Sequence, residues 1–392
     1  MKIGIASLIA GYVLSQFYRA FLAVLAPALE ADIGATPEDL AFASGLWFLI
    51  FAGFQIPVGA ALDRVGPRMT ATVLLAIGGA GGAVLFAMAQ SPLHISLAMA
   101  LIGIGCSPVL MASYFIFARV YSPAVFATLA GMTIGIGSLG NIFSAAPMAW
   151  AVGLFGWRET VMGIAALTLL VALIIWATVK DPEKVVSTAK GSVLTLLAMP
   201  ALWPIFIMML VNYAPSAGLR GLWVAPYARD VFAADVGTIG TVTLIMGLAM
   251  IAGNFAYGPM DRIFGTRKWV IFAGNALGAV ACLALYAMPD RGLWVSVALL
   301  ALVGFAGASF PMLVAHAKAF FPAHLTGRGV TLINLFGVGG VGLFQFVTRP
   351  IYAASADGAQ TAAEPYAALF LFAGLALVVG LAVYLLSQDR TD

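Results

Sequence analysis

The stretch GAALDRVGPR (59–68) stands directly after the second long apolar segment of this chain. A similar stretch, GPMDRIFGTRK (258–268), follows the eighth apolar segment, roughly 200 residues later. LIGIGCSPVLMASYF (101–115) and LVGFAGASFPMLVAH (302–316) form another pair at a comparable offset. Because similarity at a fixed long period indicates a duplicated architecture, we expect the chain to consist of two related halves.

The composition predicts an all-α membrane protein. Of 392 residues, 62% are hydrophobic and 9% are charged, whereas roughly 25% of the residues of a soluble domain are charged. A bilayer core of about 30 Å requires about 20 apolar residues per helix. Hydropathy then predicts twelve transmembrane helices at residues 3–28, 39–62, 69–89, 94–117, 124–151, 159–179, 202–227, 237–260, 269–288, 293–316, 328–352 and 366–386. We expect the first of them to be a retained membrane helix rather than a signal peptide.

The polar stretch KDPEKVVSTAKGS (180–192) separates the two predicted halves. We therefore expect a six-helix bundle over residues 1–179, a cytoplasmic linker over 180–201 and a second bundle over 202–392. Cys106 and Cys282 lie in opposite halves, and their spacing predicts neither a disulfide framework nor a metal site. The sequence contains no nucleotide-binding loop, so we expect no role for ATP, and the net charge of +3 does not indicate nucleic-acid binding. We expect no cofactor and no catalytic residue.

The basic residues predict the orientation in the membrane. If the amino terminus is cytoplasmic, thirteen of the nineteen basic residues lie on the cytoplasmic side and four lie outside. The positive-inside rule then places both termini in the cytoplasm, as expected for a bacterial inner-membrane protein. The remaining two basic residues, Arg19 and Arg220, lie within predicted spans.

The first quoted stretch carries a family resemblance. Its residues match the pattern Gly-x-x-x-Asp-Arg-x-Gly-x-Arg between the second and third spans, and the chain is similar over almost its whole length to the major facilitator superfamily. The resemblance implies two pseudo-symmetric six-helix bundles that operate by alternating access. The second copy departs from the pattern, because Asp261 follows Gly258 by three residues rather than four.

We expect these two motif copies to act as gates. Asp63 and Arg64 lie where a helix reaches the cytoplasmic face, and such a charge cluster can join the bundles and break when they separate. The alternative is that the charges only orient the protein in the membrane. The candidate gating residues are Gly59, Asp63, Arg64, Gly66, Arg68, Asp261 and Arg262.

A second duplicated motif lies inside the membrane spans. YVLSQFYR (12–19) and YAPSAGLR (213–220) both read Tyr-x-x-Ser-x-x-x-Arg. At about 100° per residue, positions i, i+3 and i+7 share one helix face. Tyr12, Ser15 and Arg19 are therefore expected on one face of the first span. The seventh span repeats this arrangement with Tyr213, Ser216 and Arg220.

The two arginines predict an anion site. All sixteen carboxylates of the chain fall in loops or at the ends of spans. A charge inside the membrane costs a few kcal/mol or more unless it is paired or hydrated. A guanidinium donates paired hydrogen bonds to a carboxylate or phosphate, so a bound small anion is the expected partner. The alternative is that the arginines donate to backbone carbonyls.

The arginine pair is similar to that of the organophosphate and organic anion branches of the superfamily, which implies anion transport carried by Arg19 and Arg220. Tyr114 and Asn141 are further candidates to line the substrate site. The transporter is expected to function as a monomer. Neither the substrate, nor the direction of transport, nor the coupling ion follows from the sequence.

Other functions compete with anion transport. A proton-driven exporter of amphipathic compounds usually requires a titratable acid within the membrane, and the carboxylate positions argue against it. A copper importer would depend on the thioethers of Met246 and Met250. A transporter-like receptor would need a sensory domain, which the sequence does not show.

Overall fold

The computed structural model describes residues 2–183 and 192–391, and within these two ranges every regular element is helical. The predicted all-α fold is therefore confirmed. Most of the expected linker, residues 184–191, lies outside the described residues. Its described end contains a short helix, α13 (Val193–Leu197), and a 3₁₀ turn, η2 (Pro200–Leu202), which the sequence did not predict.

The chain divides into two compact units, and each unit contains a segment from the other half of the sequence. Unit 1 comprises Met1–Ser122, Thr133–Val193 and Pro322–Leu335, and unit 2 comprises Pro123–Met132, Leu194–Phe321 and Phe336–Asp392. The first turns of the eleventh span thus pack in unit 1, and those of the fifth span pack in unit 2. The expected division at residues 179 and 202 stays a prediction.

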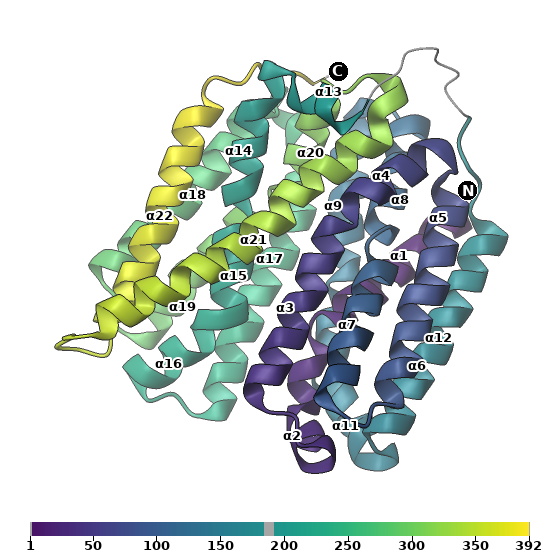
Figure 1. The fold of residues 1–392 in the computed structure, drawn as a ribbon. Helices are drawn as coiled ribbons and strands as arrows, with labels where there is room; N and C mark the ends of the chain where they lie inside the picture. Colours follow the sequence, from purple (N-terminus) through teal and green to yellow (C-terminus); the bar gives the residue numbers. More distant parts are fainter. Residues whose placement is uncertain (1, 184–191, 392) are drawn as a thin grey trace. The chain divides into compact units, whose positions relative to one another are not determined.

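Most elements of the first half are short helices joined into longer spans (Figure 1), whereas α12 (Trp157–Thr178) forms one span by itself. The elements are α1 (Lys2–Tyr18), α2 (Phe21–Ile33), α3 (Pro37–Gly53), α4 (Gln55–Arg64), α5 (Pro67–Leu74), the π-helix η1 (Leu75–Ala80), α6 (Gly81–Ala87), α7 (Pro92–Cys106), α8 (Val109–Val120), α9 (Pro123–Gly137), α10 (Leu139–Phe143), α11 (Ala146–Phe155) and α12 (Trp157–Thr178).

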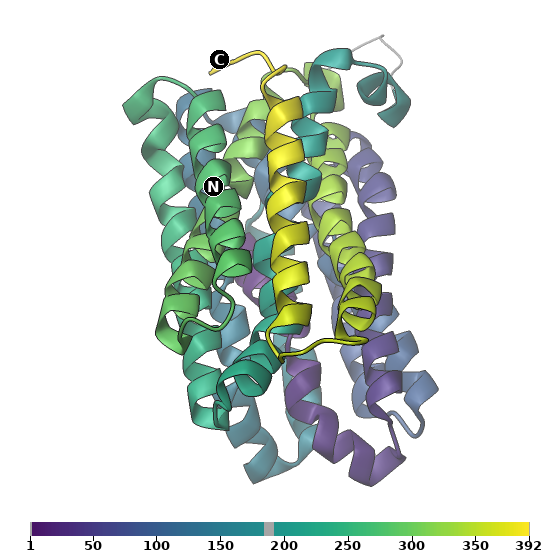
Figure 2. The same cartoon turned by 90° about the vertical axis from the view of Figure 1, so that its left-hand side faces the viewer.

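The second half contains several longer uninterrupted helices, among them α22, drawn in yellow in Figure 2. After α13 and η2 its elements are α14 (Trp203–Asn212), α15 (Ala214–Gly218), the π-helix η3 (Leu219–Trp223), α16 (Val224–Phe232), α17 (Val236–Phe264), α18 (Lys268–Ala287), α19 (Leu293–Gly307), α20 (Phe310–Lys318), the 3₁₀ turn η4 (Ala323–Leu325), α21 (Thr326–Ala356) and α22 (Glu364–Tyr384).

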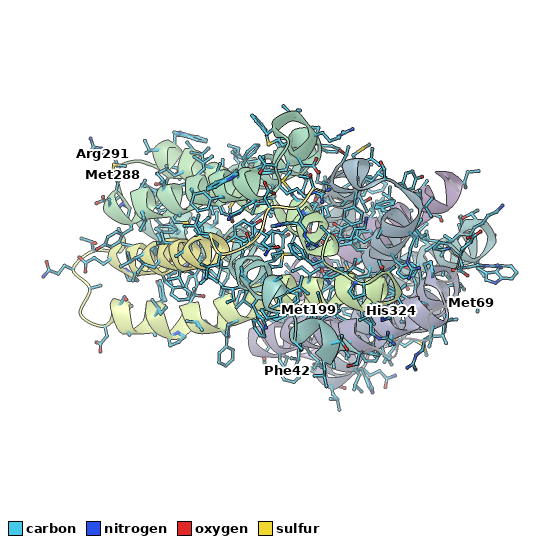
Figure 3. The ribbon with its side chains drawn as sticks, turned by 90° about the horizontal axis from the view of Figure 1, so that it is seen from above. Phe42, Met69, Met199, Met288, Arg291 and His324 are labelled. Carbon is cyan, nitrogen blue, oxygen red and sulfur yellow. The ribbon has the colours of Figure 1, made fainter. Side chains whose placement is uncertain are left out.

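The predicted membrane spans have helical counterparts. Within the described residues, eleven helices are long and apolar enough to cross a membrane, and one bent pair of helices can form a twelfth span. Large apolar side chains remain exposed on these helices, as expected where the surrounding solvent is lipid. Met69 is an example, because it is 40% exposed and points away from the helices of unit 1 (Figure 3).

Two spans are not the straight helices that the sequence suggested. The first bends by 46° between Ile3–Tyr18 and Phe21–Ile33. The seventh is interrupted after Asn212 and contains the π-helix η3. Prolines explain the second case, because Pro215 and Pro226 have no N–H for the carbonyls four residues earlier and their rings crowd those carbonyls. No proline accompanies the bend of the first span at Arg19 and Ala20, and nothing in the structure explains it.

Small residues allow close packing within unit 1. A Cβ atom on Gly105 of α7 would lie 2.0 Å from the backbone nitrogen of Gly79 in η1. Glycine therefore lets these two backbones touch, as is common where membrane helices cross. This contact holds α7 against the third span. Helix α3, which supports the candidate site, packs on α7 in turn.

Candidate functional site

Arg19 lies at the bend of the first span, about midway between Ile3 and Ile33. Its guanidinium carbon is 5.1 Å from the centre of the Trp47 ring and 5.0 Å from that of Phe51, both on α3. Within the described part of unit 1 the guanidinium makes no hydrogen bond and no ion pair, and its Nε is buried without a partner. Cation–π contacts thus support a charge that has no fixed counter-ion.

The first span places its other two motif residues on α1, one helix before Arg19. Tyr12 and Ser15 are both buried. The Tyr12 hydroxyl accepts a hydrogen bond of 3.0 Å from Gln16 Nε2. A Cβ on Gly137 of α9 would lie 2.2 Å from the Tyr12 ring, so this glycine leaves space for the ring. The helix ends at Tyr18, and the expected common face therefore holds for Tyr12 and Ser15 but does not extend as regular helix to Arg19.

The two minor candidates also belong to unit 1. Tyr114 on α8 is fully buried and lies close enough to Tyr12 for the two phenols to interact electrostatically. Asn141 on α10 is half-buried. Its carbonyl oxygen accepts a bond of 2.9 Å from the Ser144 hydroxyl, and no hydrogen bond links its side chain to Arg19 among the described residues. Asn141 follows Gly140, where a Cβ would lie 2.0 Å from the Val13 carbonyl oxygen of α1, so both candidates lie on helices that adjoin the motif of the first span.

Arg220 lies in the π-helix η3 of unit 2. Its Nε donates to the carbonyl oxygen of Thr243 on α17 over 3.4 Å, at the long end of the range for such bonds. A Cβ on Gly247 would lie 3.0 Å from the Arg220 Nη2, so the guanidinium rests on this glycine. Arg220 therefore donates to a backbone carbonyl, as the alternative for the two arginines expects, but only through one long hydrogen bond. It has no carboxylate partner among the described residues of its unit.

Tyr213 and Ser216 take part in helix packing. Tyr213 stands at the break between α14 and α15, and its ring meets that of Phe310 at a centroid distance of 5.6 Å. The Ser216 hydroxyl donates to the Tyr213 carbonyl over 3.0 Å. A Cβ on Gly307 of α19 would lie 2.2 Å from that hydroxyl. Ser216 is therefore a small contact residue in this state, and its expected role towards a substrate stays a prediction.

Gly247 offers a direct test of the Arg220 position. Gly247→Ala should stabilise α17 by about 0.5–1 kcal/mol, because alanine restricts the unfolded chain more than glycine. The new methyl group should displace the guanidinium by a few tenths of an ångström and lower substrate affinity roughly 3-fold. Thermal unfolding and equilibrium binding would measure the two effects.

The control for this variant is Gly240→Ala on the same helix, where a Cβ would meet nothing within 4 Å. It should give a similar gain in stability and leave binding unchanged. Equal affinities of the two alanine variants would show that the contact between Gly247 and Arg220 has no role in binding.

The first gating motif joins the end of α4 to the start of α21 within unit 1. The Asp63 carboxylate accepts hydrogen bonds from the backbone N–H groups of Gly327 (2.8 Å) and Arg328 (3.2 Å). It also lies 3.5 Å from the Arg328 guanidinium. A Cβ on Gly59 would lie 2.2 Å from the Thr331 hydroxyl. The carboxylate thus occupies the positive end of a helix, and Gly59 permits the approach.

The rest of this motif holds the loop before α5. Gly66 has a φ of +108°, and a Cβ there would lie 2.7 Å from the Asp181 carboxylate. That carboxylate accepts the Arg68 N–H over 2.8 Å, and the Arg68 Nε donates to the Trp176 carbonyl over 2.8 Å. Arg64 is exposed and makes no ion pair with a described residue. The gating candidates of the first copy therefore form two groups. Gly59 and Asp63 make a helix-end contact with α21, and Gly66 and Arg68 form a loop clamp that holds the loop before α5.

The second half repeats the loop clamp. Asp389, just after α22, accepts the backbone N–H groups of Arg267 (3.2 Å) and Lys268 (3.0 Å) and the Thr266 hydroxyl. Partial burial acts to raise the pKa of Asp389, but these hydrogen bonds outweigh burial and hold it below its usual range. The Lys268 ammonium donates to the Leu385 carbonyl over 2.7 Å, as Arg68 does to Trp176. Sequence reasoning missed both carboxylates because they lie far along the chain from the motifs.

The helix-end contact of the second half uses different residues. In unit 2 a Cβ on Gly258 would lie 3.1 Å from the Thr128 Cα, near the start of α9. Arg262, four residues after Gly258, donates to the Thr128 hydroxyl over 3.0 Å. Asp261 instead forms a buried ion pair of 3.1 Å with Arg267. Arg262 thus takes the place that Asp63 holds in the first copy, and Asp261 is not its equivalent.

Trp47 and Phe51 were not among the predicted site residues. Their i, i+4 spacing on one helix was visible in the sequence, but their meeting with Arg19 requires the tertiary structure. Met246 and Met250, proposed as copper ligands in one alternative, are buried where α17 meets Gly304 of α19. Their position is that of ordinary packing residues.

Two related units built from apolar spans, with arginines inside those spans, are the architecture of a multi-pass membrane transporter. A family model described as the Major Facilitator Superfamily matches residues 8–221 and again 205–392. The chain therefore belongs to the Major Facilitator Superfamily, and it is a transporter rather than an enzyme.

Individual relatives are distant. The chain is 25% identical over 181 residues to the uncharacterized transporter YybO of Bacillus subtilis, an alignment that covers 46% of this chain and 41% of that protein. It is 22% identical to a putative tartrate transporter of Agrobacterium vitis, over 96% of this chain and 88% of that protein.

Two solved structures share the fold. The human organic anion transporter MFSD10 has a TM-score of 0.75 at 19% identity, with 98% of this chain and 99% of that chain covered. The fucose:proton symporter FucP of E. coli has a TM-score of 0.76 at 17% identity, with 98% of both chains covered.

Proposed function

We propose that this protein is a secondary transporter of a small anion, and that Arg19 and Arg220 carry the binding of that anion during alternating access. The observation that carries the proposal is the position of Arg19, which lies inside a membrane span without a hydrogen bond or ion pair to any described residue of its unit. A guanidinium in such surroundings has a strong electrostatic preference for an anion.

The names of two relatives agree with an anionic substrate. One is called a putative tartrate transporter and one structural neighbour is called an organic anion transporter. From the distribution of basic residues we place the protein in a bacterial cytoplasmic membrane with both termini inside. The two motif copies are proposed as gates on the cytoplasmic side, and the monomer as the functional unit.

Uptake into proteoliposomes tests the charge of the substrate. Purified protein should take up labelled tartrate or a related carboxylate and should ignore neutral sugars and organic cations of similar size. Arg19→Gln should abolish this uptake. Transport of a cation, or uptake that does not require Arg19, would contradict the proposed function.

Exchange of anion for anion should be faster than net flux. No carboxylate or histidine lies near the middle of a predicted span, so the sequence provides no evident proton carrier there. An empty site would leave desolvated positive charge uncompensated, which makes its passage across the membrane costly. Preloading proteoliposomes with unlabelled tartrate should therefore accelerate labelled uptake several-fold without a pH gradient.

Sucrose-loaded proteoliposomes of equal osmolality and the Arg19→Gln variant serve as controls for exchange. If preloading has no effect, while a pH gradient drives accumulation of an anion that does not titrate in that range, exchange is not the preferred mode. A proton site on the protein would then have to exist.

A further inference from the structure

The aromatic pair beside Arg19 forms a compact cluster with it. The Trp47 and Phe51 rings stack at 4.9 Å with an interplanar angle of 16°, and the Arg19 guanidinium carbon lies almost equally far from both centres. Trp47 is 0% exposed and Phe51 is 2% exposed. The guanidinium therefore contacts both rings of the aromatic stack rather than a single ring.

This cluster contains two hydrogen-bond donors without acceptors. The Trp47 indole Nε1 and the Arg19 Nε are both buried, and neither has a partner among the described residues. Neither group can accept a hydrogen bond, so they cannot satisfy one another. Buried donors are normally paired, and two orphans in one cluster indicate an acceptor that binds there.

The neighbouring helix fixes the position of Trp47. A Cβ on Gly103 of α7 would lie 2.8 Å from the Trp47 carbonyl oxygen. Glycine thus lets α7 approach α3 closely, and Figure 1 shows these two helices side by side. The close contact sets the height and rotation of α3, so the backbone that carries the indole is held in place independently of any ligand.

The second half shows which residues helix packing alone requires at the positions that correspond to Trp47 and Phe51. A Cβ on Gly304 of α19 would lie 3.0 Å from the Met246 carbonyl oxygen, which makes Met246 the counterpart of Trp47 and Met250 that of Phe51. Methionine fills such a site with an apolar, adaptable side chain. The first half instead has two aromatic rings and an indole N–H. Helix packing does not account for this difference.

We propose that Trp47 contacts the substrate and determines its class. The indole N–H donates to an anionic oxygen held by Arg19, and the Trp47–Phe51 stack receives the carbon skeleton beside that oxygen. Such a site fits a small organic carboxylate better than an inorganic oxyanion, which has no apolar part to place against the rings. This inference rests on the proposed anion transport and narrows it to organic anions.

Equilibrium binding to the purified full-length protein in lipid nanodiscs tests the inference. The probes are tartrate, succinate and inorganic phosphate. Wild-type protein should bind at least one carboxylate more tightly than phosphate. Trp47→Phe keeps a ring but removes the N–H, and it should lower carboxylate affinity at least about 10-fold, the lower end of the effect of losing one hydrogen bond to a charged group.

Two further variants separate the donor from the apolar wall. Trp47→Met copies the second half, and it should lose both carboxylate affinity and the preference over phosphate. Phe51→Leu keeps the indole and should lower carboxylate affinity while phosphate affinity stays the same. The matched control is Trp294→Phe, because Trp294 is 59% exposed on α19 and should not affect binding.

The possible failures are distinguishable. If both Trp47 variants bind carboxylates like the wild type while Arg19→Gln does not, Trp47 has only a packing role and the anion site stands. If the wild type binds phosphate but no carboxylate, the inferred substrate class is wrong. If Arg19→Gln binds all probes like the wild type, the proposed function itself fails.

Discussion

Arg19→Lys is expected to lower the transport rate at limiting substrate on the order of 100-fold, although it keeps the positive charge. Lysine loses the planar fork that donates two parallel hydrogen bonds to a carboxylate. It also loses the guanidinium that contacts Trp47 and Phe51 in the structure. One hydrogen bond to a charged group contributes about 1.5–3 kcal/mol, which corresponds to roughly 10- to 150-fold.

Uptake by proteoliposomes and equilibrium binding would measure this loss. Arg19→Gln, which removes the charge as well, should be at least as impaired. The matched control is Arg291→Lys, in the exposed loop between α18 and α19. A lysine variant that transports at the wild-type rate would exclude recognition by the guanidinium fork, and simple charge attraction would then be sufficient.

The existence of the transmembrane helices was predictable because the membrane environment requires it. Every span must satisfy its own backbone hydrogen bonds, so long apolar segments can only be helices. The positions of Arg19 and Arg220 within spans followed from the same reasoning. The bends of the first and seventh spans were harder to predict from the sequence. Pro215 and Pro226 were visible in the seventh span, although no irregularity was predicted from them, whereas nothing local in the sequence marked the break after Tyr18.

The surroundings of the arginines could not be predicted, because they come from other helices. The sequence does not show that Trp47 meets Arg19 while Gly247 meets Arg220. The duplicated motif suggested two similar helix faces, and the structure shows different surroundings for the two arginines. Arg19 lies against an aromatic stack, whereas Arg220 rests on a glycine and a backbone carbonyl. Identical residues in the two halves therefore need not have identical roles.

The shifted spacing in the second motif copy was visible, but its consequence was not. Asp63 follows Gly59 by four residues, so both share a helix face and meet the start of α21. In the second copy the residue four positions after Gly258 is Arg262, and Asp261 turns instead to Arg267. A displacement of one residue thus replaced an acidic contact with a basic one.

Asp63→Asn is expected to reduce maximal turnover roughly 10- to 50-fold while changing the apparent substrate affinity less than about 3-fold. The ionised carboxylate accepts two backbone N–H groups at the positive end of α21 and faces Arg328. An amide has one acceptor oxygen and no charge, so it would leave one N–H unpaired and lose the favourable helix-end electrostatics. The state that contains this contact would become less populated.

The size of the effect on turnover depends on the charge rather than on the shape of the side chain. Asp63→Glu should therefore recover part of the rate, whereas Arg291→Gln, in the exposed loop between α18 and α19, should leave it unchanged. Unfolding temperatures of the three variants would separate gating from a loss of stability. A rise in KM with unchanged maximal rate would place Asp63 in substrate binding, which its distance along α4 from the Arg19 cluster argues against. Because a transporter must pass through every state in each cycle, weakening one state slows the cycle even when the binding site is intact.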